Sequence, residues 1–71
     1  MNEIIFMVEE DSEGGYSAEA LGYSIFTDAD SIPELKKNIF DAMHCHFADQ
    51  SEDVPKIIRL HFVREEVLAY A

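Results

Sequence analysis

The sequence has little cysteine, few basic side chains and no tryptophan. Its single cysteine, Cys45, excludes an internal disulfide, and an unpaired thiol is typical of a reducing compartment. Five Lys and Arg side chains stand against 15 Asp and Glu, which gives a formal net charge of -10 and a pI near 4.4. Because nucleic-acid phosphates are bound through Lys and Arg, this balance argues against direct binding of nucleic acid.

Long hydrophobic runs are also missing. The N-terminal apolar run, Ile4–Val8, has five residues and no basic segment before it. It is too short for a signal peptide or for the roughly 20 apolar residues of a membrane span. We therefore expect a cytoplasmic protein without membrane association. With 71 residues, no repeat and no linker, one domain is expected over residues 1–71.

Apolar residues make up 48% of the chain, enough for a small core, and their spacing predicts three strands before a helix. The strands are expected at Ile4–Val8, Tyr16–Leu21 and Tyr23–Thr27. The pair Gly14-Gly15 marks the first turn, because glycine accepts positive φ values. Short strands joined by short turns favour an antiparallel meander.

A helix is predicted from Ser31 to about Ala48. Ser31 is a good N-cap, Pro33 fits the first turn, and the Glu34 carboxylate can reach back to the Ser31 amide in a capping box. The buried stripe of this helix is expected to comprise Ile32, Leu35, Ile39, Ala42, Met43 and His46, widened by Phe40 and Phe47. A solvated loop is predicted to follow at residues 49–53.

The last predicted strand is Ile57–Val63, in which Ile58, Leu60 and Phe62 share one face. The fold class is therefore α+β with the order β-β-β-α-β: an antiparallel-type sheet with one helix packed on one face. The tail at residues 65–71 is largely apolar and finds no place in so small a core. It either docks on a partner subunit or frays.

No catalytic, cofactor or metal site is predicted. His44 and His46 lie two residues apart, about 200° around a helix, so they cannot hold one ion together. We expect His46 on the packed stripe and Cys45 inside the packed helix, without an activating neighbour. Gly14-Gly15 is too short a pattern for a phosphate loop. The protein is therefore not expected to be an enzyme.

Acidic residues cluster after the first strand, at Glu9, Glu10, Asp11 and Glu13. The interior of that strand holds no carboxylate and the sequence has no calcium-loop pattern, so we do not expect these residues to converge on a metal ion. Two interpretations stay open. The cluster is either a solvated loop that aids turn formation and solubility, or a charged surface that contacts a partner.

Two segments resemble proteins of the HicB-like family. Residues 13–19, EGGYSAE, resemble the GGY-x-A motif that opens the second strand of that family. Residues 25–39 resemble its T-x-G-D-T-x-E-E-A-x-x-N segment, although Ala29 stands where glycine is usual. The positions kept in that segment are Thr27, Asp30, Ser31, Glu34 and Asn38. The resemblance covers residues 3 to about 47 and implies a truncated RNase H-like fold of the order β-β-β-α-β.

HicB-like proteins are the antitoxin halves of toxin–antitoxin pairs. The resemblance therefore implies a non-catalytic module that neutralises a small, basic, RNA-cleaving HicA-like toxin. The contact surface would then be the acidic cluster Glu9, Glu10, Asp11 and Glu13. The family's C-terminal DNA-binding module does not follow in this sequence, so DNA binding is not carried over. Gly22-Tyr23-Ser24 also stands where the family has a Pro-Gly-Cys turn.

The alternative is an orphan structural or regulatory homo-oligomer of unassigned function. The first strand is apolar on both faces, and Val67, Leu68 and Tyr70 add further apolar surface. Contiguous exposed apolar surface usually marks an interface. Under either hypothesis we expect self-association, because a 71-residue domain without a disulfide or a metal has a narrow stability margin.

Overall fold

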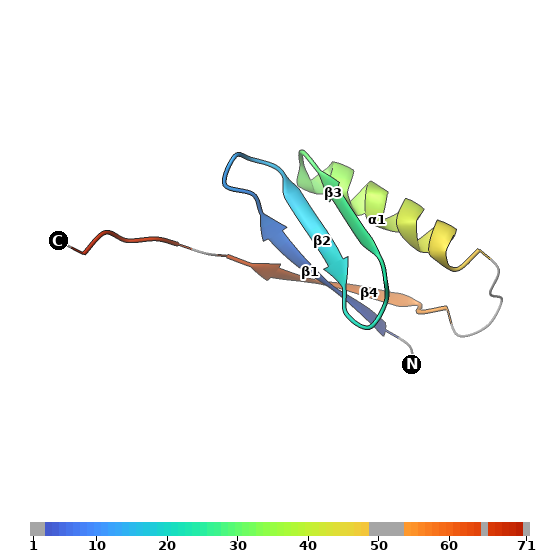
Figure 1. Ribbon diagram of the computed structural model, residues 1–71. Coiled ribbons are helices and arrows are strands. Elements are labelled where there is room, and N and C mark those ends of the chain that lie inside the picture. The colour runs from blue at the N-terminus through green and yellow to red at the C-terminus, as the bar shows by residue number, and fades with distance from the viewer. Residues whose placement is uncertain (1–2, 49–53, 65, 71) are drawn as a thin grey trace.

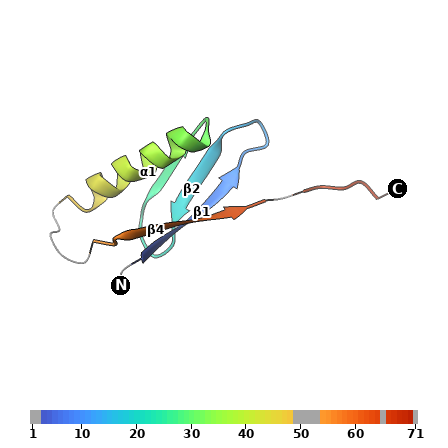
Figure 2. The ribbon, with the colours of Figure 1, turned by 180° about the vertical axis from the view of Figure 1, so that it is seen from behind.

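The computed structural model describes residues 3–48, 54–64 and 66–70, and its elements follow the predicted order (Figure 1). These elements are β1 (Glu3–Glu10), β2 (Tyr16–Ala20), β3 (Phe26–Ala29), α1 (Ile32–His46) and β4 (Ile57–Val63). The strands form one sheet in the order β3-β2-β1-β4. Figure 2 shows α1 along one face of this sheet, which confirms the α+β class and the single-helix layer.

The sheet is mixed, which corrects the expectation of an antiparallel-type sheet for its last strand. β1 pairs antiparallel with β2, and β2 antiparallel with β3, as the meander predicts. β4, however, pairs parallel with β1, with Phe6 opposite Leu60. The physical reason is the helix between β3 and β4. Because α1 returns the chain from the end of β3 to the opposite end of the sheet, β4 begins at the same end as β1 and runs parallel to it.

The core lies between the sheet and α1. Alternate residues of β1 point toward the helix, and Ile4, Phe6 and Val8 are 0–1% exposed. The remaining buried apolar side chains are Ala18, Ala20, Ile25, Leu35, Ile39, Met43 and Phe47. Full burial of a large apolar side chain contributes roughly 1.5–3 kcal/mol, so these residues hold the layers together. The two small alanines of β2 leave room for the helix to pack closely above that strand.

The helix begins at the predicted N-cap. The Glu34 backbone N–H donates to Ser31 Oγ at 3.3 Å, and Pro33 lies in the first turn. Glu34 Oε1 accepts from the backbone N–H of Asp30 at 2.9 Å, one residue earlier than the Ser31 amide that the capping-box pattern predicts. Both bonds satisfy polar groups at the start of the helix and tie it to the end of β3.

Three side chains of the predicted stripe, Leu35, Ile39 and Met43, are buried. Phe40 is 63% exposed, so the expectation that it widens the stripe is wrong: its position turns it away from the sheet. His46 is also exposed at the end of the helix, with its ring packed edge-on against Phe47 at a centroid distance of 4.8 Å. Cys45 is exposed rather than packed.

β3 lies further along the chain than the predicted strand Tyr23–Thr27. A turn closed by the Ala20 N–H donating to the Ile25 carbonyl, at 3.0 Å, occupies the start of that segment. Ile25 is buried before the strand begins, and Phe26 projects from the opposite face with 65% exposure. The predicted loop at residues 49–53 lies outside the described residues.

β4 is less covered than the other strands. The backbone of α1 lies over β2 and β3, so Ile58 and Leu60 are half-buried and Phe62 is 55% exposed. Residues 66–70 extend past β4, away from the sheet (Figure 1). Val67, Leu68 and Tyr70 are 90%, 82% and 103% exposed. Within the described ranges, no helix has the length and the apolar character needed to cross a membrane.

Candidate functional site: the acidic end of the sheet

The turn between β1 and β2 lies against the end of β3. The Asp11 N–H donates to the Gly15 carbonyl at 2.9 Å, and the Gly14 N–H donates to the Asp11 carbonyl at 3.0 Å. Gly15 has a φ of 89°, and a Cβ there would stand 3.3 Å from the Ala29 carbonyl oxygen. Glycine therefore allows the acidic turn to approach the end of β3.

The strand register places two carboxylates on the outer face of the sheet. Glu9 of β1 is opposite Ser17 of β2, and Ser17 is opposite Asp28 of β3. Since neighbouring strands lie about 4.8 Å apart, the backbones of Glu9 and Asp28 are separated by roughly 10 Å, with the small Ser17 side chain between them. This row presents two negative charges on one surface.

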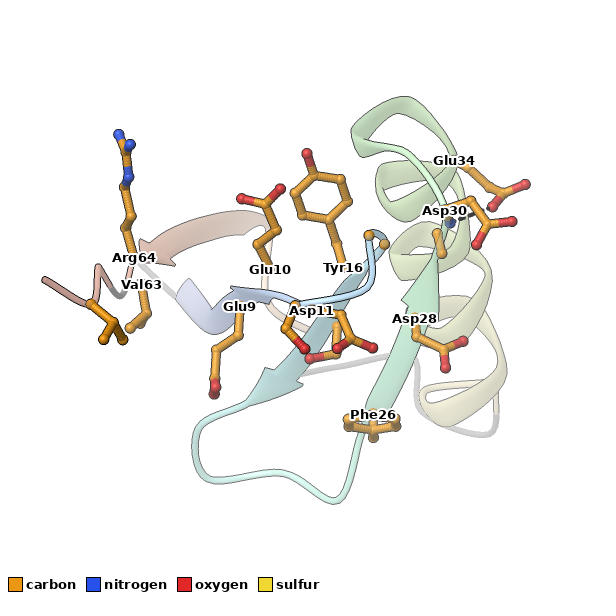
Figure 3. Close-up of a pocket in the computed structure, with 16 residues that line it drawn as sticks. Glu9, Glu10, Asp11, Tyr16, Phe26, Asp28, Asp30, Glu34, Val63 and Arg64 are labelled. Atoms are coloured by element: carbon orange, nitrogen blue, oxygen red, sulfur yellow. Dashed lines mark hydrogen bonds between the residues drawn. The ribbon is translucent and has the colours of Figure 1, made fainter. Parts of the chain in front are cut away.

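Further carboxylates surround the same end of the sheet. Glu10 is opposite Tyr16 and lies on the helix side of the sheet, whereas Glu9 points to the other side (Figure 3). Asp30 lies just before the N-cap of α1 and Glu34 lies in its first turn, and the bond from the Asp30 N–H to Glu34 Oε1 fixes the backbone there. Carboxylates near a helix N-terminus are stabilised by the positive end of the helix dipole.

Together these residues line an open concavity of about 1030 Å³. We call its six carboxylates the acidic end: Glu9, Glu10, Asp11, Asp28, Asp30 and Glu34. One cation, Arg64, lies among the described lining residues, beside the apolar Val63 and Val67. All six carboxylates belong to exposed residues, so they keep most of their hydration.

Three of the four predicted contact residues, Glu9, Glu10 and Asp11, line this concavity, whereas Glu13 does not. Sequence reasoning missed Asp28, Asp30 and Glu34 as members of the same surface. Their segment carries a signal, since three acidic residues occur within seven positions, but the same pattern is also typical of a turn followed by a helix cap. The register of β2 with β3 brings them beside the first acidic cluster.

The arrangement suits an extended cationic surface more than a single ion. Among residues 3–48, 54–64 and 66–70, no three His, Cys, Asp or Glu side chains are grouped so that they could hold a metal ion. The carboxylates point to both sides of the sheet, as Figure 3 shows for Glu9 and Glu10. Spread, hydrated charges of one sign attract and orient a partner of opposite charge over a wide area.

The fold and the acidic end define a small α+β module whose most distinctive surface is a group of carboxylates gathered at one end of the sheet. Two proteins are similar in sequence over most of their length. A UPF0150 protein of Archaeoglobus fulgidus is 54% identical over 46 residues, which cover 65% of this chain and 68% of that protein. A UPF0150 protein of Thermotoga maritima is 40% identical over 67 residues, 94% of this chain and 91% of that protein.

The chain belongs to the UPF0150 family. That family name assigns no activity, substrate or partner to its members. No family model matches the chain, and no solved structure matches it.

Proposed function

We propose that this protein is a non-catalytic, HicB-like binding module that uses its acidic end to neutralise a small, basic, RNA-cleaving toxin of the HicA-like type. The observation that carries the proposal is the gathering of six carboxylates, from two separate stretches of the chain (residues 9–11 and 28–34), around one concavity. Such a surface would compete with the phosphates of RNA for the same Lys and Arg side chains of the toxin.

The electrostatics favour fast and selective encounter with such a partner. The chain carries a formal net charge of -10, and opposite potentials steer association. Because the carboxylates are exposed in the free protein, a toxin has to remove water only at the contacts that it makes. We therefore expect binding that weakens as salt screens the charges.

The residues that carry the HicB-like resemblance support the shape of this end. Gly15 permits the approach of the turn to β3, and Ser31 with Glu34 caps the helix beside it. Asn38 Nδ2 donates to the Asp28 carbonyl at 2.9 Å, which ties α1 to β3. These motif positions thus act on the geometry of the acidic surface, which is the property that a binding module needs.

The core contributes no group to the proposed contact. Among the described residues, no buried residue is polar or charged. The cysteine thiol at Cys45 is exposed on α1, away from the acidic end.

The test is complex formation with any small basic protein that a reading frame next to this gene encodes. The double variant Glu9→Gln/Asp28→Asn removes two charges from the outer-face row without touching the helix cap. We expect it to weaken the complex about three- to tenfold, from losses of a few tenths of a kcal/mol or more per exposed charge. The matched control Glu19→Gln/Asp41→Asn removes two exposed charges outside the acidic end and leaves affinity nearly unchanged.

Two measurements complete this test: calorimetric affinity at increasing salt, and cleavage of RNA by the basic protein with and without this chain. Equal losses for the two double variants would refute the placement of the contact. Failure to bind or inhibit any neighbouring basic protein would remove the basis of the antitoxin function.

A further inference from the structure

β4 forms an open edge of the sheet. It pairs with β1 on one side, and among the described residues no strand pairs with its other side. An edge strand presents unpaired N–H and C=O groups, which bind another strand unless charge, proline or a covering element blocks the edge. β4 has seven residues and no proline, and α1 lies over β2 and β3 rather than over β4. The edge is therefore long enough to pair with a further strand.

The charge of this edge is opposite to that of the rest of the chain. Residues 56–64 contain three of the five Lys and Arg side chains and none of the 15 Asp and Glu side chains. Lys56 directly precedes β4 and Arg64 directly follows it, and both are exposed. Figure 3 shows Arg64 on the same side of the sheet as Glu10, which is the helix side.

The carboxylates of β1, Glu3, Glu9 and Glu10, lie one strand further from this edge. Glu3 is already paired, because its Oε2 accepts a hydrogen bond from Arg59 Nη2 at 2.8 Å. A strand added at the edge would lie about 4.8 Å from β4 and about 9.6 Å from β1. Since Coulomb energy falls with distance and salt screens it over roughly 8–10 Å, the cations of β4 outweigh the carboxylates of β1 at the added strand.

Between the two terminal cations, the helix-side face of β4 is apolar. Ile58 and Leu60 are half-buried, and Phe62 is 55% exposed. Alternation along the strand therefore places a cation, three apolar side chains and a second cation on one face: Lys56, Ile58, Leu60, Phe62 and Arg64. Exposed apolar surface with a polar rim is typical of a protein interface.

We propose that β4 binds an extended acidic segment of another protein, which adds to the sheet as a further strand antiparallel to β4. The residues of that segment opposite Ile58, Leu60 and Phe62 are apolar, and those opposite Lys56 and Arg64 are Asp or Glu. Cross-strand pairs of opposite charge and of apolar side chains stabilise a sheet, whereas like charges destabilise it. A second β4 does not fit this pattern, because antiparallel pairing about Leu60 would set Lys56 opposite Arg64.

This inference goes beyond the toxin-binding proposal and does not depend on it. None of the six carboxylates of the acidic end takes part in the pairing, and the two surfaces select partners of opposite charge. Loss of one interaction therefore leaves the other to be measured separately.

The first experiment measures the binding of two nine-residue peptides to the whole chain by calorimetry. Both peptides have capped ends and the pattern X-Thr-Val-Thr-Val-Thr-Val-Thr-X, where X is Glu in one and Lys in the other. The valines then lie opposite the three apolar residues of β4, and the terminal residues lie opposite its two cations. The Glu-ended peptide should bind with a Kd of roughly 10–100 micromolar, as expected for a small interface, and about tenfold more tightly than the Lys-ended peptide.

Variants with exchanged charge locate the contact. Lys56→Glu/Arg64→Glu should reverse the preference, so that the Lys-ended peptide binds more tightly. The matched control Lys36→Glu/Lys37→Glu makes the same change of net charge at two exposed lysines of α1 and should keep the preference for the Glu-ended peptide. Circular dichroism establishes that both variants fold.

The second experiment uses the unmodified chain, so its result stands even if a variant does not fold. Hydrogen exchange is measured with and without saturating Glu-ended peptide. Every second amide of Ile57–Val63, the set that faces away from β1, should exchange at least tenfold more slowly with the peptide bound. The amides of β3 should be unchanged.

Failure of the Glu-ended peptide to bind, equal affinity for the two peptides, or protection at β3 instead of β4 would overturn the proposal. A peptide-free chain that dimerises in sedimentation equilibrium and protects the same amides of β4 would also overturn it, because a second copy would then occupy the edge.

Discussion

The two edges of the sheet are built differently. β3 has four residues, and α1 lies over it with Asn38 Nδ2 bonded to the backbone carbonyl of Asp28 at 2.9 Å. β4 has seven residues and a cationic and apolar composition, and no helix among the described parts of the chain lies above it. The β3 edge is therefore short, acidic and tied to the helix, while the β4 edge is long and open. The difference indicates that one edge is protected from pairing and the other is available for it.

The largest expected effect compares two leucines that face the same core from the two sides. Leu35 of α1 is fully buried, so Leu35→Ala should cost about 2–5 kcal/mol of unfolding free energy. Leu60 of β4 is half-buried, so Leu60→Ala should cost roughly half as much. Urea denaturation followed by circular dichroism, at dilutions that keep the chains monomeric, measures both. Equal losses of unfolding free energy for the two variants would show that the core at β4 is covered as fully as the core beneath α1.

An intermediate effect is expected at the bond that protects β3. Asn38→Asp keeps the side-chain shape and a similar helix propensity, but the carboxylate cannot donate to the Asp28 carbonyl. We expect a loss of about 0.5–1.5 kcal/mol. Hydrogen exchange should rise for the amides of β3 and stay unchanged for those of β4. Faster exchange spread evenly over both edges would mean that this bond does not protect β3 specifically.

The smallest effect concerns the ion pair beside β4. The Arg59 guanidinium donates a hydrogen bond to the Glu3 carboxylate and lowers the pKa of Glu3 below its ordinary value of 4.5, although partial desolvation opposes this. A carboxyl with a lowered pKa stabilises the fold above its ordinary pKa, and this contribution is lost as the pH falls through the folded-state value. The wild type should therefore be slightly more stable than Glu3→Gln at neutral pH.

That advantage should disappear well below pH 4.5 in denaturation measured across acid pH. A difference that stays constant down to strongly acid pH would mean that the charge of Glu3 is not its source.

Much of the fold follows from local pattern. The apolar run Ile4–Val8, the Gly14-Gly15 turn, and the cap at Ser31 each predict their element, because each depends on residues close in sequence. The direction of β4 could not be predicted from its own residues. It depends on where the helix returns the chain, and an apolar–polar alternation is the same in a parallel and in an antiparallel edge strand.

The candidate site was predictable only in part. Glu9, Glu10 and Asp11 are consecutive, so the sequence displays them as a cluster. Asp28 joins them through the pairing of β2 with β3, and that strand starts later than the pattern predicts. Phe40 illustrates the same limit, since its hydrophobicity predicts burial while the helix orientation leaves it 63% exposed. In each case tertiary placement decided the outcome.

The central position of β1 has a consequence for how the protein assembles during synthesis. β1 joins β2 across a short turn, but its other neighbour comes from residues 57–63, more than 40 positions later. When only the part of the chain from β1 to α1 has been synthesised, the β1–β2 hairpin and the helix can form. The edge of β1 that later pairs with β4 is then still unpaired. Contacts so distant in sequence close late, so we expect the docking of β4 to be the final and slowest step of folding.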